Sequence, residues 1–261
     1  MTRLFWLRLY FLFVLAQALL VGCSVVQPAW ITVVLPWPAS PLNARFIAAL
    51  YLMGAITALL CLFARYYAEM RIALIQIGWV TGVLLLITLP HFGEFTLITF
   101  PYRWVIFYTI DPVATGLLLW RWRGRDPSPA GFNPFAPLFL SYAGVLGVCG
   151  VLLLVLPTWA SRLWPWTLPP ILAQVYSVFL LTCALGGWFA AREPRWSGVR
   201  IYVLANLGML LLIIGVSLWH ADRFGAGVAT WIWYGSCITG VFGFSMAVLR
   251  QPGAMTEGLR G

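Results

Sequence analysis

Charged residues are scarce in this sequence, and lysine is absent altogether. Asp, Glu, Lys and Arg together make up 9% of the 261 residues, whereas soluble proteins average about 25%. Apolar side chains account for 62%, and the mean hydropathy is +0.92. This balance excludes a soluble enzyme, a disordered chain and a disulfide-stabilised scaffold, and it indicates a polytopic membrane protein.

Familiar catalytic and ligand-binding motifs are also missing. The sequence contains no Walker loop, dinucleotide-binding glycine pattern, nucleophile elbow or H-E-x-x-H zinc motif. All five cysteines lie in apolar stretches without metal-ligand spacing, which favours a packing role. They are Cys23, Cys61, Cys149, Cys183 and Cys237. These absences favour a non-enzymatic protein, and no motif predicts a metal or a cofactor.

Eight apolar runs are long enough to cross a bilayer as α-helices, each of which needs about 20 residues. None of the runs alternates as the strands of a membrane β-barrel do, and a helix satisfies its backbone hydrogen bonds within its own segment. We therefore predict an all-α fold with eight transmembrane helices. The runs are 9–27, 46–64, 72–90, 104–120, 138–156, 175–191, 201–219 and 233–249.

The 16 arginines indicate how these spans are oriented. With a cytoplasmic N-terminus, only Arg45, Arg103, Arg162 and Arg223 fall on outer loops, and all others fall on inner segments. Because cytoplasmic loops are enriched in Arg, this bias predicts that both termini are cytoplasmic, which requires an even number of spans. The net charge of +9 then reflects orientation rather than nucleic-acid binding. We expect the protein to lie in a bacterial inner (plasma) membrane.

The chain matches itself at an offset of 129 residues without a gap. The two histidines, His91 and His220, coincide at this offset, as do tryptophans such as Trp30 and Trp159. We predict two four-helix repeats, residues 1–129 and 130–261. Four spans return the chain to the same side, so both repeats insert in the same orientation, as parallel repeats.

The start of the chain leaves one alternative open. Leu20-Val21-Gly22-Cys23 is typical of a lipoprotein signal box, and cleavage before Cys23 would remove the first span and lipidate that cysteine. The offset pairs the first span with the fifth, which is internal. We therefore expect the first span to be retained.

His91 and His220 end the third and seventh runs at equivalent positions, each shortly before a carboxylate. If the two halves pack around a pseudo-two-fold axis, the imidazoles could face each other and ligate haem or a metal, each oriented by the nearby carboxylate. The alternative is a local hydrogen-bonding role at a helix end. The position of both residues at the rim of the membrane favours the alternative.

Asp111 is the only acid well inside a predicted span. An ionisable group at that depth is by default a functional candidate, and here it suggests a proton- or cation-coupled site. Arg45, at the outer start of the second span, is its candidate ion-pair partner, and a purely structural pair is the alternative. Other polar residues within spans, such as Gln17 and Gln76, are expected to bond between helices.

Proline and tryptophan gather in the outer segments 30–41 and 159–170. Because proline lacks a backbone N–H, these segments cannot be plain helices. Tryptophan suits the membrane–water interface, so we expect an outer interfacial aromatic rim. Its members are Trp30, Trp37, Trp104, Trp159, Trp166 and Trp233.

These segments carry a resemblance to a known group of proteins. The strings Pro36-Trp37-Pro38-x-x-Pro41-Leu42-x-Ala44-Arg45 and Trp164-Pro165-Trp166-x-Leu168-x-Pro170 resemble a motif of uncharacterised bacterial multi-pass membrane proteins. In that family a Trp-Pro-Trp-x-Leu-x-Pro-Leu-x-Ala-Arg-like segment precedes an apolar span. The resemblance covers most of each half, although Gln174 stands where the second half would carry Arg. It implies a multi-pass membrane fold, and it implies no activity.

Three functions remain for an integral membrane protein of this kind. The first is a non-enzymatic accessory or scaffold subunit, whose partners are the lipid bilayer and other membrane-protein subunits. The second is a small transporter or channel in which Asp111 is the coupling residue. The third is a haem- or quinone-associated redox protein that uses His91 and His220.

Overall fold

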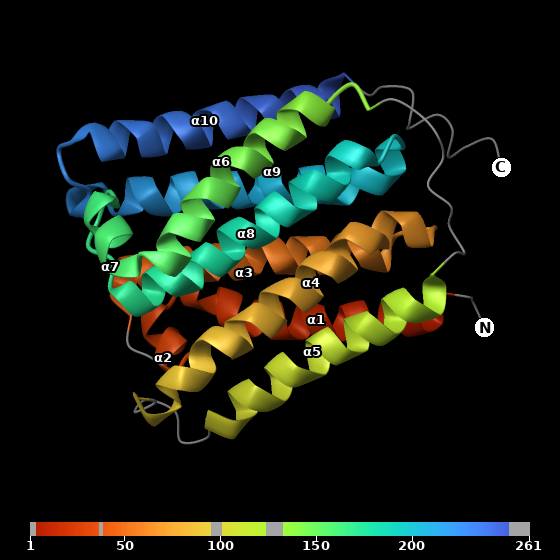
Figure 1. The fold of residues 1–261 in the computed structure, drawn as a ribbon, viewed down its shortest axis with the longest axis horizontal. Coiled ribbons are helices and arrows are strands. Elements are labelled where there is room, and N and C mark those ends of the chain that lie inside the picture. Colours follow the sequence, from red (N-terminus) through yellow and green to blue (C-terminus); the bar gives the residue numbers. More distant parts are fainter. Residues whose placement is uncertain (1–3, 37–38, 95–100, 124–132, 251–261) are drawn as a thin grey trace.

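The computed structural model describes residues 4–36, 39–94, 101–123 and 133–250, and every regular element in these ranges is a helix. Long helices run back and forth beside one another (Figure 1). They are α1 (Phe5–Gly22), α3 (Pro41–Leu62), α4 (Tyr67–Thr88), α5 (Pro101–Trp122), α6 (Ala136–Val155), α8 (Pro170–Arg192), α9 (Trp196–Trp219) and α10 (Val228–Leu249).

Seven of these helices are long and apolar enough to cross a membrane: α1, α3, α4, α6, α8, α9 and α10. The chain is therefore an all-helical integral membrane protein, as its composition predicts. The remaining long helix, α5, is 22 residues long and coincides with the predicted run 104–120. It is less apolar because it carries Asp111 and Pro112 along its length and Arg121 in its last turn.

The proline-rich segments form short helical turns, as the lack of a proline N–H predicts. Helix α2 (Ile31–Val34) follows a 3-10 turn, and helix α7 (Pro157–Ala160) precedes one. Prolines occupy the first position of α3, α7 and α8, where a backbone N–H has no helical partner in any case. The 3-10 turns are Cys23–Val25, Pro28–Trp30, Leu89–Glu94, Ser161–Leu163 and Ala221–Arg223.

The long helices pack in two groups with the same internal contacts. Helix α1 packs on α3 and α4 packs on α5; likewise α6 packs on α8 and α9 packs on α10. The groups meet where α3 contacts α9 and where α4 contacts both α8 and α9. The apolar windows of α6 and α10 are each 17% buried, against 61% for α8. These two helices therefore lie at the periphery, and α8 lies in the core.

Charges hold the two groups together at the end of the bundle where α1 begins and α10 ends, here named the termini end (Figure 1). Arg200 of α9 donates to Glu69 of α4 at 2.9 Å, and Arg71 of α4 donates to Glu193 at 2.9 Å. Arg195 also donates to Glu193, at 2.6 Å from its Nε. Both carboxylates are buried, so these pairs hold acids that would otherwise be costly to desolvate.

A polar and aromatic cluster joins the groups at the opposite end, which holds α2 and α7 and is named the α7 end. The Oδ1 of Asn43 accepts hydrogen bonds from Trp166 Nε1 and from the Tyr176 hydroxyl, both at 2.8 Å. The ring of Phe46 lies 5.1 Å from that of Trp166 and 4.8 Å from that of Tyr176, between ring centroids. The buried amide therefore has partners, and the aromatic rings exclude water from it.

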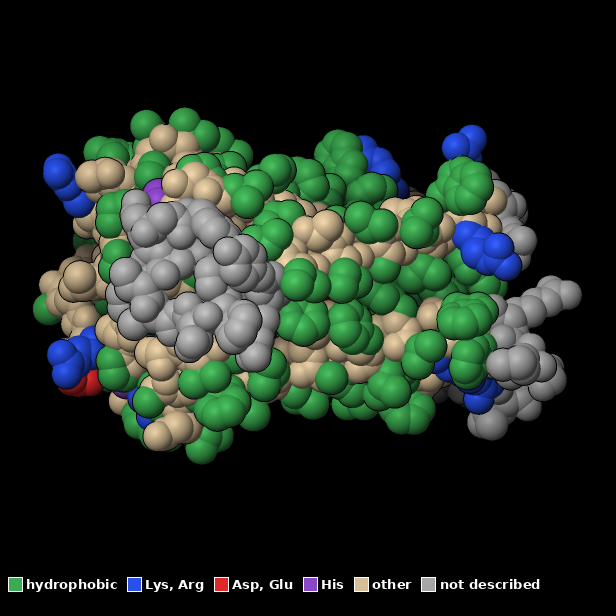
Figure 2. Space-filling model, turned by 90° about the horizontal axis from the view of Figure 1, so that it is seen from below, with side chains coloured by type: hydrophobic (Ala, Val, Ile, Leu, Met, Phe, Trp, Pro, Cys, Tyr) green, Lys and Arg blue, Asp and Glu red, His purple; other side chains and the backbone are tan. Residues whose placement is uncertain are grey.

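The surface agrees with a membrane setting. Figure 2 shows one face on which hydrophobic side chains cover the middle of the molecule, while Arg side chains are visible mainly toward the two ends. An apolar middle with charged ends is the arrangement that a hydrocarbon core bounded by water requires.

Candidate functional site

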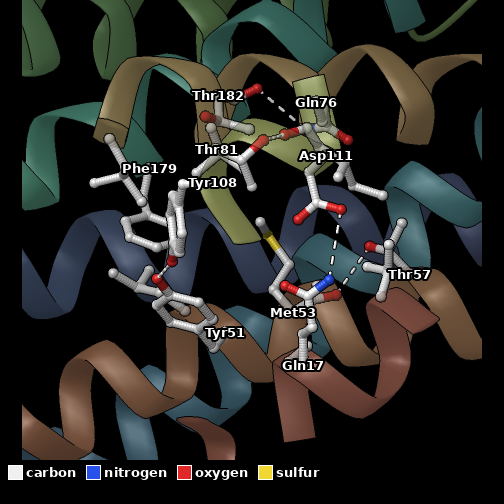
Figure 3. Close-up of a pocket in the computed structure, with 17 residues that line it drawn as sticks. Gln17, Tyr51, Met53, Thr57, Gln76, Thr81, Tyr108, Asp111, Phe179 and Thr182 are labelled. Carbon is white, nitrogen blue, oxygen red and sulfur yellow. Dashed lines mark hydrogen bonds between the residues drawn. The ribbon is translucent and has the colours of Figure 1, made fainter. Parts of the chain in front are cut away.

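A cavity of about 90 Å³, named the first cavity, lies between α1, α3, α4, α5 and α8 (Figure 3). Asp111, halfway along α5, lines it and is only 3% exposed. The volume is enough for a few water molecules or one small ion. The cavity therefore places the acid that the sequence singles out at a space between helices.

Helix α1 supplies both hydrogen-bond donors to the Asp111 carboxylate. The Tyr10 hydroxyl donates to Oδ1 at 3.2 Å, and Gln17 Nε2 donates to the same oxygen at 3.5 Å. Seven residues are close to two helical turns, so Tyr10 and Gln17 share one face of α1. Within the described ranges, no Arg or His forms an ion pair with Asp111.

Three threonines present acceptor oxygens to the same cavity (Figure 3). Thr57, Thr81 and Thr182 each donate their hydroxyl hydrogen to the carbonyl four residues earlier, at 2.7–2.8 Å. A hydroxyl that has donated its hydrogen keeps lone pairs for a further partner. The lining is therefore richer in acceptors than in free donors, which favours a cation over an anion.

Pro112 and two tyrosines shape the wall beside Asp111. Pro112 has no N–H, so the carbonyl of Tyr108 lacks its usual helical donor. The side-chain hydroxyl of Tyr108 forms a hydrogen bond with the Tyr51 hydroxyl of α3 (Figure 3). Gln76 of α4 donates to the Thr182 carbonyl of α8 at 3.1 Å, which is the interhelical role expected of it. Side chains from several helices thus line the first cavity.

A larger cavity of about 530 Å³, named the second cavity, lies among α6, α8, α9 and α10, with α3 as one wall. Its lining is mainly apolar and includes Leu180, Cys237 and Gly240. Leu50 and Phe179 line both cavities, which therefore adjoin at these residues. Sequence patterns do not reveal this cavity, because its volume depends on how side chains of distant helices fit.

Comparisons with known proteins give no family. No protein-family model, no curated protein and no solved structure matches this chain. The resemblance to multi-pass bacterial proteins therefore stays a prediction.

The structure places Arg45 away from Asp111, at the α7 end. Its Nε donates to the Val25 carbonyl at 3.1 Å, and its Nη1 lies 2.8 Å from His220 Nε2. The guanidinium also sits over the Trp219 ring, 4.4 Å from the centroid. The expected Asp111–Arg45 ion pair is therefore not formed, because these contacts hold the arginine at the helix ends.

His220 has a defined protonation state in this contact. Arginine is always charged and can only donate, so His220 Nε2 must accept with a neutral ring. Partial burial, followed by the charge of Arg45, lowers the pKa of His220. The lone pair that a haem iron would need on Nε2 is thus engaged, which favours the hydrogen-bonding alternative for this residue. His91 lies in the 3-10 turn after α4.

The tryptophans of the predicted rim divide into two kinds. Trp30 and Trp159 are exposed at the α7 end, as an interfacial rim requires. Trp104 and Trp166 are instead buried, because their indole N–H groups bond to Thr88 at 3.0 Å and to Asn43 at 2.8 Å. Trp233 is partly buried and donates to Ser217. Trp37 lies outside the described residues.

Sequence reasoning missed several residues of the site. Tyr10 and the three cavity threonines look like ordinary helix residues in the sequence, and only the packing brings them to Asp111. Glu69 and Glu193 had a signal that could have found them. They are acids close in sequence to Arg71 and Arg195 at predicted span ends, where a charge needs a partner.

Among the described residues, no group of three or more His, Cys, Asp or Glu side chains is arranged to hold a metal ion. In the part of the chain that the structure describes, Asp111 is the only carboxylate that lines the first cavity.

Proposed function

We propose that the first cavity binds a proton or a small monovalent cation at Asp111, and that the protein is a small membrane carrier that uses this site. One observation carries the proposal. The Asp111 carboxylate is buried and receives hydrogen bonds from Tyr10 and Gln17, yet no cationic side chain in the described part of the chain pairs with it. A buried carboxylate without a counter-charge takes up a proton or a cation.

The chemistry of the lining supports a cation. The carboxylate and the threonine oxygens are hard oxygen acceptors, and hard cations prefer oxygen ligands. The cavity also lies between five helices, and its carboxylate is buried. These properties suit a coupling site in a transporter.

We further propose that the chain consists of two parallel four-helix repeats, offset by 129 residues. The pairing of corresponding helices within the two groups, α1 with α3 and α6 with α8, α4 with α5 and α9 with α10, supports this architecture. The two cavities support it as well, because the offset relates their lining residues to each other. The related pairs are Gln17/Leu146, Leu50/Phe179, Tyr51/Leu180, Gly54/Cys183, Val80/Met209, Thr81/Leu210, Leu84/Ile213, Tyr108/Cys237 and Asp111/Gly240.

The proposal includes α5 as an eighth span, with both termini cytoplasmic. Helix α5 has the length of its neighbours and packs along α4 (Figure 1). Asp111 interrupts its apolar surface, but that side chain faces protein rather than lipid. The bias of arginines toward the inner segments supports the orientation.

Ion flux through proteoliposomes tests the carrier. We expect wild-type protein to move protons or Na⁺ down an imposed gradient, read by a trapped pH- or Na⁺-sensitive dye. Asp111→Asn keeps the size of the side chain and removes its charge, so flux should fall about tenfold or more. Asp222→Asn is the matched control, because Asp222 is exposed and outside the cavity. Equal flux in wild type and Asp111→Asn would contradict the proposal.

An accessory subunit is the second candidate function. The small buried share of α6 and α10 favours it, because a partner helix could cover surface that the chain leaves open. Native mass spectrometry from mild detergent distinguishes the two candidates. A membrane protein that co-purifies in stoichiometric amount supports the accessory role. Ion flux by the protein alone, with no such partner bound, supports the carrier.

A further inference from the structure

A groove of about 380 Å³ lies on the outside of the bundle between α6 and α8, and it is named the α6–α8 groove. Its side chains Trp79, Leu140 and Trp188 are 42–49% exposed, and a Cβ added to Gly144 meets no atom within 4 Å. The groove is therefore open to the surroundings of the protein. It is lined by Trp79 of α4, by Leu140, Ala143 and Gly144 of α6, and by Leu181, Ala184, Leu185 and Trp188 of α8.

The α6–α8 groove extends from the middle of a span almost to the termini end. Arg192 is the last residue of α8, Trp188 lies one turn before it, and Leu181 lies eleven residues before it. At about 1.5 Å of rise per residue, Leu181 is about 16 Å from the end of the helix. The hydrocarbon core of a bilayer is about 30 Å thick. The groove therefore covers the depth of one leaflet, which is the reach of a single acyl chain.

A cation lies at the termini end of this groove, at the level of lipid headgroups. The guanidinium of Arg192 stacks on the Trp188 ring, with 3.4 Å between Cζ and the ring centroid, and its Nη1 donates to the Trp188 carbonyl at 3.2 Å. These contacts hold the side chain beside the groove, yet the residue is exposed. Because a guanidinium has five N–H donors, it can still bind phosphate oxygens.

The charges near Arg192 favour an anionic headgroup over a zwitterionic one. No carboxylate in the described part of the chain pairs with Arg192. Glu69 and Glu193, the carboxylates that the described residues place at the termini end, are buried in ion pairs with other arginines. A zwitterionic lipid would bring its own cation to this positive surface, whereas an anionic lipid brings only the complementary charge. Further exposed arginines at this end are Arg121, Arg123 and Arg250.

The first half of the chain lacks all three features of this site. At the offset of 129, Phe63 stands in place of Arg192, Leu59 in place of Trp188, and Leu15 in place of Gly144. The cation, the ring that supports it and the glycine that leaves the groove open therefore belong to the second half alone. The fold proposed for both halves does not require them.

We propose that the α6–α8 groove binds one anionic glycerophospholipid from the leaflet at the termini end. An acyl chain lies in the groove against Gly144 and Leu181, and the phosphate accepts hydrogen bonds from Arg192. The volume lies within the range of ligand pockets, about 300–1,000 Å³. The site is separate from the first cavity, so it does not depend on the ion-binding role of Asp111.

Two variants test the two parts of the site, and each has a matched control. Arg192→Gln removes the charge at the headgroup, and Arg250→Gln removes an equally exposed charge at the same end but away from the groove. Gly144→Leu fills the groove, where an added Cβ meets open space. Gly116→Leu adds the same side chain to another open helical glycine, which lines neither the groove nor the two cavities.

Native mass spectrometry of the delipidated full-length protein measures binding of dioleoyl phosphatidylglycerol. We expect one-to-one binding to wild type, Arg250→Gln and Gly116→Leu. Occupancy should fall about tenfold or more in Arg192→Gln, the range for a lost hydrogen bond to a charged group. A similar fall is expected in Gly144→Leu, because the leucine displaces several methylene groups of the acyl chain from apolar contact. Dioleoyl phosphatidylethanolamine, with the same chains, should bind wild type about tenfold more weakly.

The proposal is supported if both site variants lose binding and both controls retain it. It is overturned if wild type binds no phosphatidylglycerol one-to-one, or if Arg192→Gln binds it as well as Arg250→Gln does. Equal binding by Gly144→Leu and Gly116→Leu, both purified as monodisperse peaks, also overturns it. Equal binding of the two lipids to wild type would contradict the assignment to an anionic headgroup. Flux through the Asp111 site is measured separately, so a failure of the carrier proposal remains distinguishable.

Discussion

Asp111 and Arg45 show how strongly the role of a residue depends on its neighbours. Both are rare charged groups near or within spans, and their opposite signs predict a pair. In the structure, Arg45 contacts His220 and Trp219. Asp111 accepts hydrogen bonds from Tyr10 and Gln17. The depth of Asp111 could be predicted from its place in an apolar run. Its partners could not, because the rotation of each helix about its axis decides which side chains meet.

The contact between Arg45 and His220 predicts a pH-dependent stability. The pKa of His220 is lowered in the folded protein, so folding favours the neutral ring. The stabilisation is therefore complete above the ordinary pKa of about 6.5 and is lost as the pH falls through the lower folded value. Thermal unfolding in detergent should show a lower midpoint at about pH 5 than at about pH 8.

His220→Gln is the control for this pH dependence. Its amide oxygen still accepts from Arg45, and it does not titrate. We expect a smaller loss of thermal midpoint between the two pH values than in wild type. An equal loss in both proteins would show that His220 does not cause the pH dependence.

At the scale of elements, every predicted apolar run coincides with a long helix, and the helices begin a few residues earlier than the runs. Proline in the first turn contributes to the difference for α3, α6 and α8. Ser40 Oγ accepts from the Asn43 N–H and extends α3 toward the α7 end. Apolar periodicity detects the middle of a span, and capping residues set its first turn.

Equivalent elements also carry equivalent hydrogen bonds. Trp104 donates to Thr88, and Trp233 donates to Ser217, both at 3.0 Å and at the same separation along the chain. Trp104→Phe and Trp233→Phe should each lower the free energy of unfolding by about 1 kcal/mol, measured by denaturant titration in detergent. If only one of them is destabilising, the two bonds do not have equivalent roles.

The ion pairs at the termini end predict that substitutions of their members destabilise the protein to different extents. Glu193 accepts from both Arg71 and Arg195, whereas each arginine makes only part of the cluster. Glu193→Gln should therefore destabilise the protein more than Arg71→Gln, with a loss of about 1–3 kcal/mol or more. Thermal unfolding of the purified variants measures the order. A larger loss in Arg71→Gln would contradict this account of the cluster.

At the scale of the whole molecule, composition and periodicity predict an all-helical membrane protein, and the structure confirms it. By hydropathy, seven helices qualify as spans. Helix α5 is not among them, because it carries the acid and the proline of the proposed site. The cavities could not be predicted. Their volumes depend on which tyrosines, leucines and glycines of separate helices meet, and sequence spacing along one helix does not contain that information.

The proposed orientation predicts which positions can be labelled from outside the cell. In a background with the exposed Cys23 and Cys149 replaced by Ser, Val33→Cys and Arg162→Cys at the α7 end should react with an impermeant maleimide in intact cells. Arg192→Cys, at the termini end, should react only after permeabilisation. The reverse pattern would place the termini outside.

Infrared difference spectroscopy of the purified protein tests the central proposal about Asp111 most directly. It follows the carboxyl C=O stretch while the pH or the Na⁺ concentration is stepped. We predict a protonated-carboxyl band that changes with pH or is displaced by Na⁺, that is absent in Asp111→Asn and that persists in Asp222→Asn. A spectrum with no Asp111-dependent change under either step would contradict a proton- or cation-binding role for this residue.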